Sequence, residues 1–227
     1  AEAERLKSGL EGLQGLRRGK VRVACSQAVA PEFMPRAIGV FRGLYPMVDF
    51  DVRVVDHEQA ATALASYDVD LALVFSPDSL PGFERLALLE QRLVALMPRE
   101  HVLCEKPELR LRDCAGHSLA LPDRSTGGRQ LLDAFSARTG ITFEVAIESN
   151  SFEFLRRSVV QSGLVSFQID VGAPAADADS DIIVRKIDRR DAPPANLVLG
   201  KLPGRNLPQI CLIFAEYVMD WMALMRD

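Results

Sequence analysis

Histidine and cysteine are scarce in this 227-residue sequence, which contains three histidines and four cysteines. The cysteines are far apart, at Cys25, Cys104, Cys114 and Cys211, so they do not form the close pairs that zinc sites and thiol redox motifs use. We interpret them as buried, reduced thiols, because a free cysteine behaves as a small hydrophobic residue. The sequence therefore predicts that the chain holds no metal.

Glycine is absent where a nucleotide-binding turn would need it. The strand-like run VRVAC continues into SQAVAPEF without a glycine, whereas a dinucleotide site requires a glycine-rich turn after its first strand. The Gly127–Gly128 pair is not followed by Lys-Ser or Lys-Thr, which excludes a P-loop. HEQAA lacks the second histidine of a zinc protease, and GHSLA ends in alanine where a nucleophile elbow needs glycine. The sequence therefore predicts no cofactor and no catalytic residue.

Long apolar runs and blocks of positive charge are also missing. No segment approaches the ~18 apolar residues that a membrane span needs, and the first twenty residues lack the continuous apolar stretch of a secretory signal. A mature form that has lost its signal has the same appearance. The formal charge is −4 and the basic residues are dispersed, so we expect this chain to bind nucleic acid poorly by itself.

Strand-like and helix-like segments alternate along the chain from Val21. VRVAC, a helical stretch at 31–45, the alternating run DFDVRVV, an alanine-rich helix at 57–66 and VDLALVF form a first unit. SLALP, a helix stopped by Gly140, TFEVAIE, FEFLRRSVVQS and LVSFQI form a second unit of the same type. This order implies right-handed crossovers and largely parallel sheets in an α/β protein.

Three further segments complete the organisation. VGAPAADADSD is a predicted loop, and DIIVRKI and NLVLGKL are predicted strands. The closing helix from Pro208 carries a hydrophobic stripe that we expect to be core, formed by Ile210, Phe214, Tyr217, Trp221 and Leu224. Leucines at helical spacing in residues 1–18 are typical either of a solvated helix or of part of a coiled coil.

Polar residues follow several predicted strands at their carboxyl ends, where ligands bind in open parallel sheets. The helices that begin there offer unpaired N–H groups and partial positive charge, which suit a small anion, typically a carboxylate. The candidate ligand-binding residues are Ser26, Gln27, His57, Arg124, Ser125, Thr126, Gly127 and Asn150. Ser26, Ser125 and Asn150 are equally well interpreted as helix caps, with Asn150 and Glu153 as a capping box, and His57 and Arg124 as solvent-facing residues.

The order of these elements resembles the effector-binding domain of LysR-type transcriptional regulators over residues 19–225. The resemblance rests on the opening GKVRVACSQAVAPEFMPRAIGVFRGLYPMVDFDVRV, on YDVDLALVF, on ESNSFEFLRRSVVQSGLVSFQ and on the closing LPQICLIFAEYVMDWM. This chain has His57 where the family often has Ser or Thr, and QSGLVSF has Gly163 but not the second glycine of the family's pattern.

The resemblance implies a fold like that of type II periplasmic binding proteins, with two Rossmann-like lobes joined by two crossover strands. It implies that residues 1–18 end a linker helix, that residues 19–91 and 192–227 form lobe I, and that residues 92–191 form lobe II. It places Ser26, Gln27 and Ser125 to Gly127 against the effector and adds Ser166 to the ligand-binding residues. A family member would be a cytoplasmic homodimer or homotetramer that has no contact with a membrane and binds DNA only through an N-terminal winged helix-turn-helix, which this chain lacks.

Two other functions fit the same architecture. A solute-binding receptor of a transporter shares the fold and the cleft, and its gene would encode an export signal. An enzyme on this scaffold, such as a dehydratase or a deaminase, would need a positioned acid or base in the cleft. The favoured interpretation is a ligand-sensing domain that binds a small metabolite between its lobes.

Overall fold

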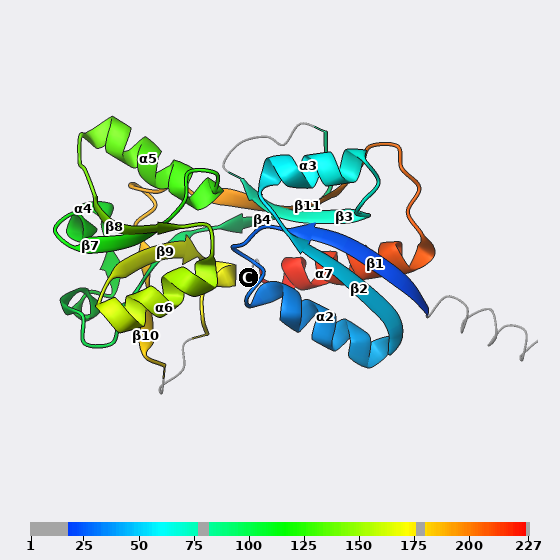
Figure 1. Cartoon of the computed structure of the whole chain (residues 1–227), viewed down its shortest axis with the longest axis horizontal. Helices are drawn as coiled ribbons and strands as arrows, with labels where there is room; N and C mark the ends of the chain where they lie inside the picture. The colour runs from blue at the N-terminus through cyan, green and yellow to red at the C-terminus, as the bar shows by residue number, and fades with distance from the viewer. Residues whose placement is uncertain (1–17, 77–81, 176–179, 226–227) are drawn as a thin grey trace, which may run out of the picture.

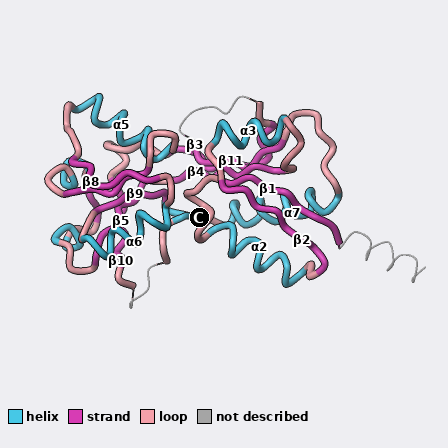
Figure 2. The backbone as a smooth tube through the Cα atoms, in the orientation of Figure 1, coloured by secondary structure: helices cyan, strands magenta, loops and turns pink. Residues whose placement is uncertain are grey.

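The computed structural model describes residues 18–76, 82–175 and 180–225, which form two α/β lobes side by side (Figure 1). The linker helix predicted for residues 1–18 lies outside the described residues, except for Arg18, which begins the first strand. The middle of the predicted loop 171–181 lies outside them as well. Figure 2 shows that strands occupy the centre of each lobe and that helices cover them.

The first lobe, here called lobe I, contains a five-stranded sheet in the order β2-β1-β3-β11-β4. Strands β1, β2 and β3 run parallel, and β11 is antiparallel to both of its neighbours. The strands are β1 (Arg18–Cys25), β2 (Met47–Val54), β3 (Leu71–Ser76), β4 (Glu84–Gln91) and β11 (Ala195–Lys201). The helices are α2 (Phe33–Leu44), α3 (His57–Ala65) and α7 (Gln209–Leu224).

The second lobe, lobe II, contains a six-stranded sheet in the order β6-β10-β5-β9-β7-β8. Its strands are β5 (Leu93–Pro98), β6 (Glu108–Leu109), β7 (Ser118–Pro122), β8 (Glu144–Ser149), β9 (Val165–Ile169) and β10 (Ile182–Ile187). Its α-helices are α4 (Leu111–Cys114), α5 (Gly127–Thr139) and α6 (Phe152–Ser162), and its 3₁₀ helices are η1 (Val102–Glu105) and η2 (Asp170–Gly172). The predicted two-lobed α/β fold is confirmed, although each sheet mixes parallel with antiparallel strands because the crossover strands pair in the opposite direction.

The chain passes between the lobes twice. Strand β4 ends at Gln91 and β5 begins at Leu93, so Arg92 alone separates a strand of one sheet from a strand of the other. The return path runs from Ile187 at the end of β10 to Ala195 at the start of β11. The lobe boundaries at 91/92 and 191/192 stay predictions of the sequence.

An aromatic cluster fills the space between α2, α7 and the sheet of lobe I. The ring of Phe41 lies 5.0 Å from that of Phe214 in an edge-on arrangement, and the ring of Phe33 stacks on Trp221 at 4.7 Å. Such pairs add to the free energy gained by burying the rings. The predicted stripe of α7 therefore belongs to the core up to Trp221, but Leu224 is 76% exposed, because α7 extends past the sheet that it covers.

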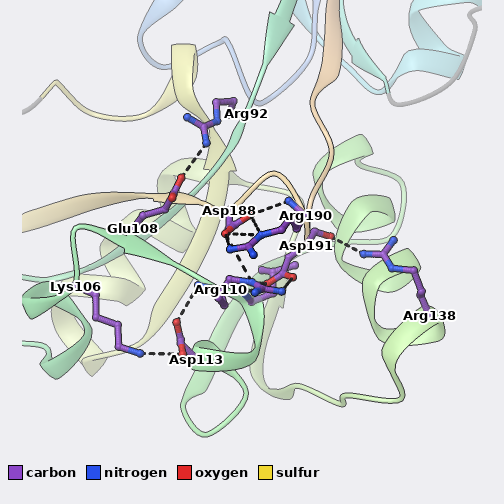
Figure 3. A network of polar contacts seen from close by, with 10 residues as sticks. Arg92, Lys106, Glu108, Arg110, Asp113, Arg138, Asp188, Arg190 and Asp191 are labelled. Carbon is purple, nitrogen blue, oxygen red and sulfur yellow. Dashed lines mark hydrogen bonds and ion pairs between the residues drawn. The ribbon is translucent and has the colours of Figure 1, made fainter.

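A network of charged groups fastens the return crossover to lobe II (Figure 3). The carboxylate of Asp191 accepts hydrogen bonds from Nε and Nη2 of Arg110 at 2.8 and 2.5 Å and from the backbone N–H of Leu111 at 2.8 Å. Arg138 donates to the backbone carbonyl of Asp191 at 2.9 Å, and Asp188 N–H donates to Leu109 O at 2.8 Å. These contacts fix residues 188–191 on lobe II and leave the remainder of the connection to lead into lobe I.

The helix caps differ from those that the sequence suggested. Helix α6 is capped by Ser151, whose Oγ accepts from the N–H of Phe154 at 3.3 Å, so the capping box predicted from Asn150 and Glu153 is wrong. Helix α5 is capped by Thr126 rather than by Ser125. Neither Ser26 nor Asn150 caps a helix, because residues 27–32 separate Ser26 from α2 and Ser151 takes the cap position of α6.

The described residues contain no helix long and apolar enough to cross a membrane. They also contain no cluster of three or more histidine, cysteine, aspartate or glutamate side chains arranged to hold a metal ion.

Candidate functional site

A cavity of about 210 Å³ lies between the lobes, where the carboxyl ends of strands from both sheets meet. We call it the strand-end cavity. Parallel strands that share a sheet end at the same edge, so residues far apart in the sequence are brought together there. Seven of the nine predicted ligand-binding residues line it: Ser26, Gln27, His57, Ser125, Thr126, Gly127 and Asn150.

Ser26 occupies the lobe I wall of this cavity directly after β1. Its backbone N–H continues the strand pairing by donating to Leu73 O at 3.0 Å. Its side-chain Oγ is buried and has no hydrogen-bond partner among the described residues. A buried hydroxyl without a partner costs free energy, so this oxygen is available to a ligand that enters the cavity.

The start of α3 forms the next part of the lobe I wall. Asp56 caps this helix by accepting from Gln59 N–H at 2.8 Å, and Gln59 Oε1 accepts from Asp56 N–H at 3.2 Å. This reciprocal arrangement is a capping box, and its sequence signal is an Asp followed by Gln three residues later. His57 is the first residue of the helix, half-buried at the cavity.

The start of α5 faces the cavity from lobe II. Thr126 caps the helix, since its Oγ1 accepts from Arg129 N–H at 3.3 Å and donates to Asp123 O at 3.0 Å. Gly127 and Gly128 follow at the first two helical positions. The first N–H groups of a helix have no intrahelical partner, and these glycines have no side chain to cover theirs. Backbone donors and the positive end of the α5 dipole therefore face the cavity.

Helix α6 contributes a third helix start on the lobe II side, with Asn150 and Phe152 in the lining. Asn150 is exposed and does not cap α6, since Ser151 takes that role. Three helix N-termini, those of α3, α5 and α6, thus converge on one cavity. Their partial charges make it attractive to an anion.

The ionisable side chains of the lining are two carboxylates and one histidine, and no Lys or Arg is among the lining residues of the described chain. Both carboxylates are already engaged in local structure. Asp56 caps α3, and Asp123 Oδ1 accepts from the N–H and the hydroxyl of Ser125 at 3.0 and 2.6 Å. Any anion would therefore be held by backbone and neutral side-chain donors rather than by a salt bridge.

Two predicted residues are not in the lining. Arg124 is exposed in the turn before α5 and lies outside the cavity. Ser166 is 3% exposed within β9, where it pairs with Leu96 on one side and Ala120 on the other. It is enclosed by the sheet, and the lining of the cavity begins at the next residue of β9, Phe167.

Gln168 also lines the cavity, although it is not among the ligand-binding residues predicted from the sequence. It is 2% exposed near the end of β9, and its Nε2 donates to Ala28 O of lobe I at 3.2 Å. Its Oε1 accepts from Nε of Arg156 on α6 at 3.2 Å. The rule that selected the other candidates, a polar residue at the carboxyl end of a predicted strand, also applies to Gln168 in LVSFQI.

The thiol nearest to the cavity is chemically inert. Cys25 precedes Ser26, is fully buried and does not line the cavity. Burial raises the pKa of Cys25 to about 12. Since the thiolate is the nucleophile, a thiol with so high a pKa does not provide one near neutral pH.

Comparison with known protein families gives one match that covers nearly the whole chain. The model described as LysR substrate binding domain matches residues 14–223. A probable RuBisCO transcriptional regulator of Cyanophora paradoxa is 27% identical over 221 residues, which cover 95% of this chain and 68% of that protein. The chain spans 56 to 58% of the length of several further curated relatives. The relatives are transcriptional regulators, not enzymes.

Solved structures share the two-lobed arrangement. The regulatory domain of Synechocystis PCC6803 CcmR, in complex with 2-PG, superposes with a TM-score of 0.78 at 22% identity and covers 92% of this chain and 99% of that one. The effector-binding domain of QuiR, in complex with shikimate, gives 0.74 at 17% identity and covers 91% of this chain and 98% of that one. At these identities the likeness establishes the fold, which is that of type II periplasmic binding proteins.

Proposed function

We propose, from the premise that this chain belongs to the LysR substrate binding domain family, that it senses a small anionic metabolite in the strand-end cavity. The chain is the effector-binding domain of a LysR-type regulator. The family match over residues 14–223 favours this function over a transporter receptor or an enzyme on the same scaffold. In the proposal, residues 19–91 and 192–227 act as one lobe and residues 92–191 as the other.

The observation that carries the proposed site is the oxygen of Ser26. A buried hydroxyl without a partner is uncommon, and here it lies in a cavity where three helix starts converge. In the proposal, Ser26, Gln27 and Asn150 donate hydrogen bonds to the metabolite, Thr126 positions the start of α5 through its cap, and the N–H groups of Gly127 and Gly128 hold the negative charge of the metabolite. His57 and Ser125 complete the contacts, whereas Arg124 and Ser166 take no part because they do not line the cavity.

The size and chemistry of the cavity favour a compact hydroxy acid. Its volume of about 210 Å³ is below the ~300–1,000 Å³ of typical drug-sized ligand pockets, which argues against a nucleotide or another large cofactor. Helix N-termini favour a carboxylate or phosphate, and the outer oxygens of Asp56 and Asp123 can accept from ligand hydroxyls. The similar domains bound to 2-PG and shikimate support this class, because their ligands are small and oxygen-rich.

The proposed mechanism is a change in the relative orientation of the lobes. A ligand that touches both walls stabilises the arrangement in which both walls reach it, and it shifts the population only by its differential affinity. Arg92 and residues 192–194 are the short connections about which the lobes would turn. A coupling of about 1 to 3 kcal/mol would change the affinity for DNA by about 5- to 150-fold.

The whole regulator is proposed to work in the cytoplasm as a homodimer or homotetramer. In this proposal a winged helix-turn-helix elsewhere in the protein binds the DNA. The negative formal charge of this chain supports such a division of labour, since the phosphate backbone of DNA attracts positively charged surfaces. Reading the coding sequence upstream separates this proposal from a transporter receptor, which would begin with an export signal.

The proposed function is tested by thermal-shift screening of the chain against small organic acids and sugar phosphates. A ligand present at about 100 times its dissociation constant adds about 2.7 kcal/mol to the free energy of unfolding, so at least one member of the panel should raise the melting temperature. The neutral amide or alcohol matching each hit serves as the control and should give a smaller shift. A panel in which acids and their neutral partners behave alike would contradict the proposed anion site.

A further inference from the structure

A second cavity, of about 480 Å³, lies between the lobes and shares no lining residue with the strand-end cavity. Gln168 and Ile169 line the first cavity, and Asp170 and Val171, the next two residues, line the second. Its lobe I wall comes from α2 and the last turn of α7, and its lobe II wall comes from β10 and the segment after β9. Each lobe therefore contributes one wall, as in the strand-end cavity.

Two aromatic rings form the base of the lobe I wall. Phe33 and Trp221 stack at 4.7 Å with an interplanar angle of 18°. Phe33 is 2% exposed, whereas Trp221 is partly exposed and offers ring surface to the cavity. Apolar side chains of Val171, Pro174 and Val184 contribute to the lining opposite. An aromatic or branched aliphatic group would bury apolar surface against these walls.

Two cationic side chains flank this apolar surface from opposite lobes. Arg36 lies on α2 with its guanidinium 5.8 Å from the centroid of the Trp221 ring, and Lys186 lies on β10. Neither forms an ion pair within the part of the chain that the structure describes.

The acidic groups of the second cavity do not balance this charge. Glu32 is engaged by Arg156, which lies 2.9 Å away. Asp170 is exposed and carries one negative charge, against the two positive charges of Arg36 and Lys186. The cavity therefore has one positive charge in excess. A ligand with a single negative charge would neutralise this excess.

We propose that the second cavity binds a small carboxylate with an aromatic or apolar body. The body packs on Phe33 and Trp221, and the carboxylate is held between Arg36 and Lys186. This site goes beyond the proposed function, since it requires no ligand in the strand-end cavity. A ligand held by both α2 and β10 contacts both lobes and therefore favours one lobe arrangement over others.

The sequence supplies a direct probe of this cavity, because Trp221 is the sole tryptophan of the chain. We expect 3-phenylpropionate to change the tryptophan fluorescence saturably. Its neutral partner, 3-phenylpropanamide, should bind at least about tenfold more weakly, because a hydrogen bond to a charged group is stronger than one to a neutral group. The absence of a saturable signal with the carboxylate would overturn the proposal.

Charge reversal on each wall locates the binding. Arg36→Glu and Lys186→Glu change exposed side chains, so the variants should fold, and each should weaken 3-phenylpropionate binding by about tenfold or more. Arg42→Glu makes the same change on α2 outside the cavity and should bind like the unmodified chain. Equal affinities of the Arg36→Glu and Arg42→Glu variants would contradict the site.

A last variant separates this inference from the proposed function. Ser26→Ala alters the strand-end cavity alone and should leave the fluorescence titration with 3-phenylpropionate unchanged. If Ser26→Ala abolishes the signal while Arg36→Glu does not, the compound binds in the strand-end cavity and the second site is refuted. A failed organic-acid screen would count against the strand-end cavity alone, because the fluorescence titrations of the Ser26→Ala and Arg36→Glu variants do not depend on it.

Discussion

Arg156 of lobe II and Glu32 of lobe I form an ion pair across the lobe interface, with Nη1 and Oε1 2.9 Å apart. The same guanidinium donates through Nε to Gln168 and through Nη2 to the carbonyl of Gly172. Gln168 donates onward to Ala28 of lobe I. Polar groups of each lobe are thus satisfied by the other lobe, and this contact lies between the strand-end cavity and the second cavity.

The two members of this ion pair should contribute unequally to stability. Arg156→Met removes donors from a side chain that is 9% exposed and should lower the free energy of unfolding by about 2 to 4 kcal/mol. Glu32→Gln alters a side chain that is 34% exposed and keeps a hydrogen-bond acceptor, so it should cost less than about 1 kcal/mol. Urea denaturation followed by circular dichroism measures both.

Arg157 provides a matched control for Arg156. It lies one residue further along α6, is 79% exposed and pairs with Glu153 within the helix. Arg157→Met should leave the free energy of unfolding within about 0.5 kcal/mol of the unmodified chain. If Arg157→Met and Arg156→Met prove equally destabilising, the interlobe contact is not the cause.

Gly172 of lobe II lies directly against the backbone of Ala28 in lobe I. A Cβ atom at this position would overlap the carbonyl oxygen of Ala28 and lie 2.8 Å from Nε2 of Gln168. Gly172→Ala should therefore push the lobes apart, with loss of stability and a larger radius of gyration in small-angle X-ray scattering. The clash involves backbone, which cannot move without shifting a lobe.

Gly39→Ala is the corresponding control within α2. No atom lies within 4 Å of a Cβ built at Gly39, and the substitution should stabilise the chain by up to about 1 kcal/mol through helix propensity. An unchanged radius of gyration in the Gly172→Ala variant, together with unchanged stability, would show that the approach to Ala28 is looser than the structure indicates.

Substitutions at Ser26 and Thr126 should have different consequences. Ser26 Oγ has no partner among the described residues, so Ser26→Ala should leave stability unchanged or raised and should weaken an organic-acid ligand by about 0.5 to 1.5 kcal/mol. Thr126→Ala should weaken the ligand similarly but also destabilise the chain by about 0.5 to 2 kcal/mol, because it removes the cap of α5. Calorimetry with a hit from the screen and thermal melts of the free variants separate the two effects.

Ser125→Ala is a useful companion to these variants. Ser125 is exposed and its hydroxyl is bonded to Asp123, so its removal should affect affinity less than the removal of Ser26. Unaltered affinity in the Ser26→Ala variant would show that Ser26 does not belong to the proposed site.

The sequence predicted the fold well because hydrophobic periodicity and strand order are local properties. Seven of the nine predicted site residues line the strand-end cavity for the same reason: they follow strands that end at one edge of a sheet. Ser166 was selected by family resemblance instead, and it lies buried inside β9, directly before the first lining residue of that strand.

Contacts between the lobes could not be predicted from local sequence patterns. Arg156 and Glu32 are 124 residues apart, and no local pattern indicates that a charged residue on α6 is buried against α2. The position of the α5 cap was also ambiguous, since Ser125 and Thr126 are adjacent and both suit a cap. Which one serves depends on the length of the turn after β7, and that length is set by the sheet.

Asp191 should make the chain sensitive to acid. The hydrogen bonds from Arg110 (Figure 3) hold the pKa of this carboxyl below its ordinary value. Asp191 is 3% exposed. A depressed pKa in the folded state contributes stability that is present above the unfolded pKa of about 3.9 and is lost as pH falls through the folded value. Asp191→Asn should cost about 2 to 3 kcal/mol at neutral pH and flatten the acid limb of the stability profile.

Asp51→Asn serves as the control for Asp191→Asn. Asp51 is 39% exposed and lies 3.7 Å from Lys20, a surface pair that should contribute less than about 1 kcal/mol. Stability measured from pH 2 to 7 by urea denaturation should therefore change for one variant only. Parallel acid limbs for the unmodified chain and Asp191→Asn would assign the acid sensitivity to other carboxyls.

The thiols should resist modification in the folded chain. Burial raises the pKa of Cys25, Cys114 and Cys211 to about 12, and Cys104 alone is partly exposed. Burial raises the pKa of Cys104 as well, but this thiol is partly exposed, so reaction in the folded chain should be confined to Cys104, with all four thiols reacting after unfolding. Labelling with Ellman's reagent, with and without guanidinium chloride, measures the number of reactive thiols.

The same burial predicts a loss of stability in alkali. A thiol whose pKa is raised on folding contributes its full stabilisation below its ordinary pKa of 9.0. This contribution is lost as pH rises toward about 12, because in that range the unfolded chain releases a proton that the folded chain retains. Cys114→Ala should show a shallower decline than the unmodified chain above pH 9.0, whereas Cys104→Ser should abolish the fast phase of native labelling. Rapid native labelling that persists in the Cys104→Ser variant would mean that a buried thiol is reached through opening of the lobes.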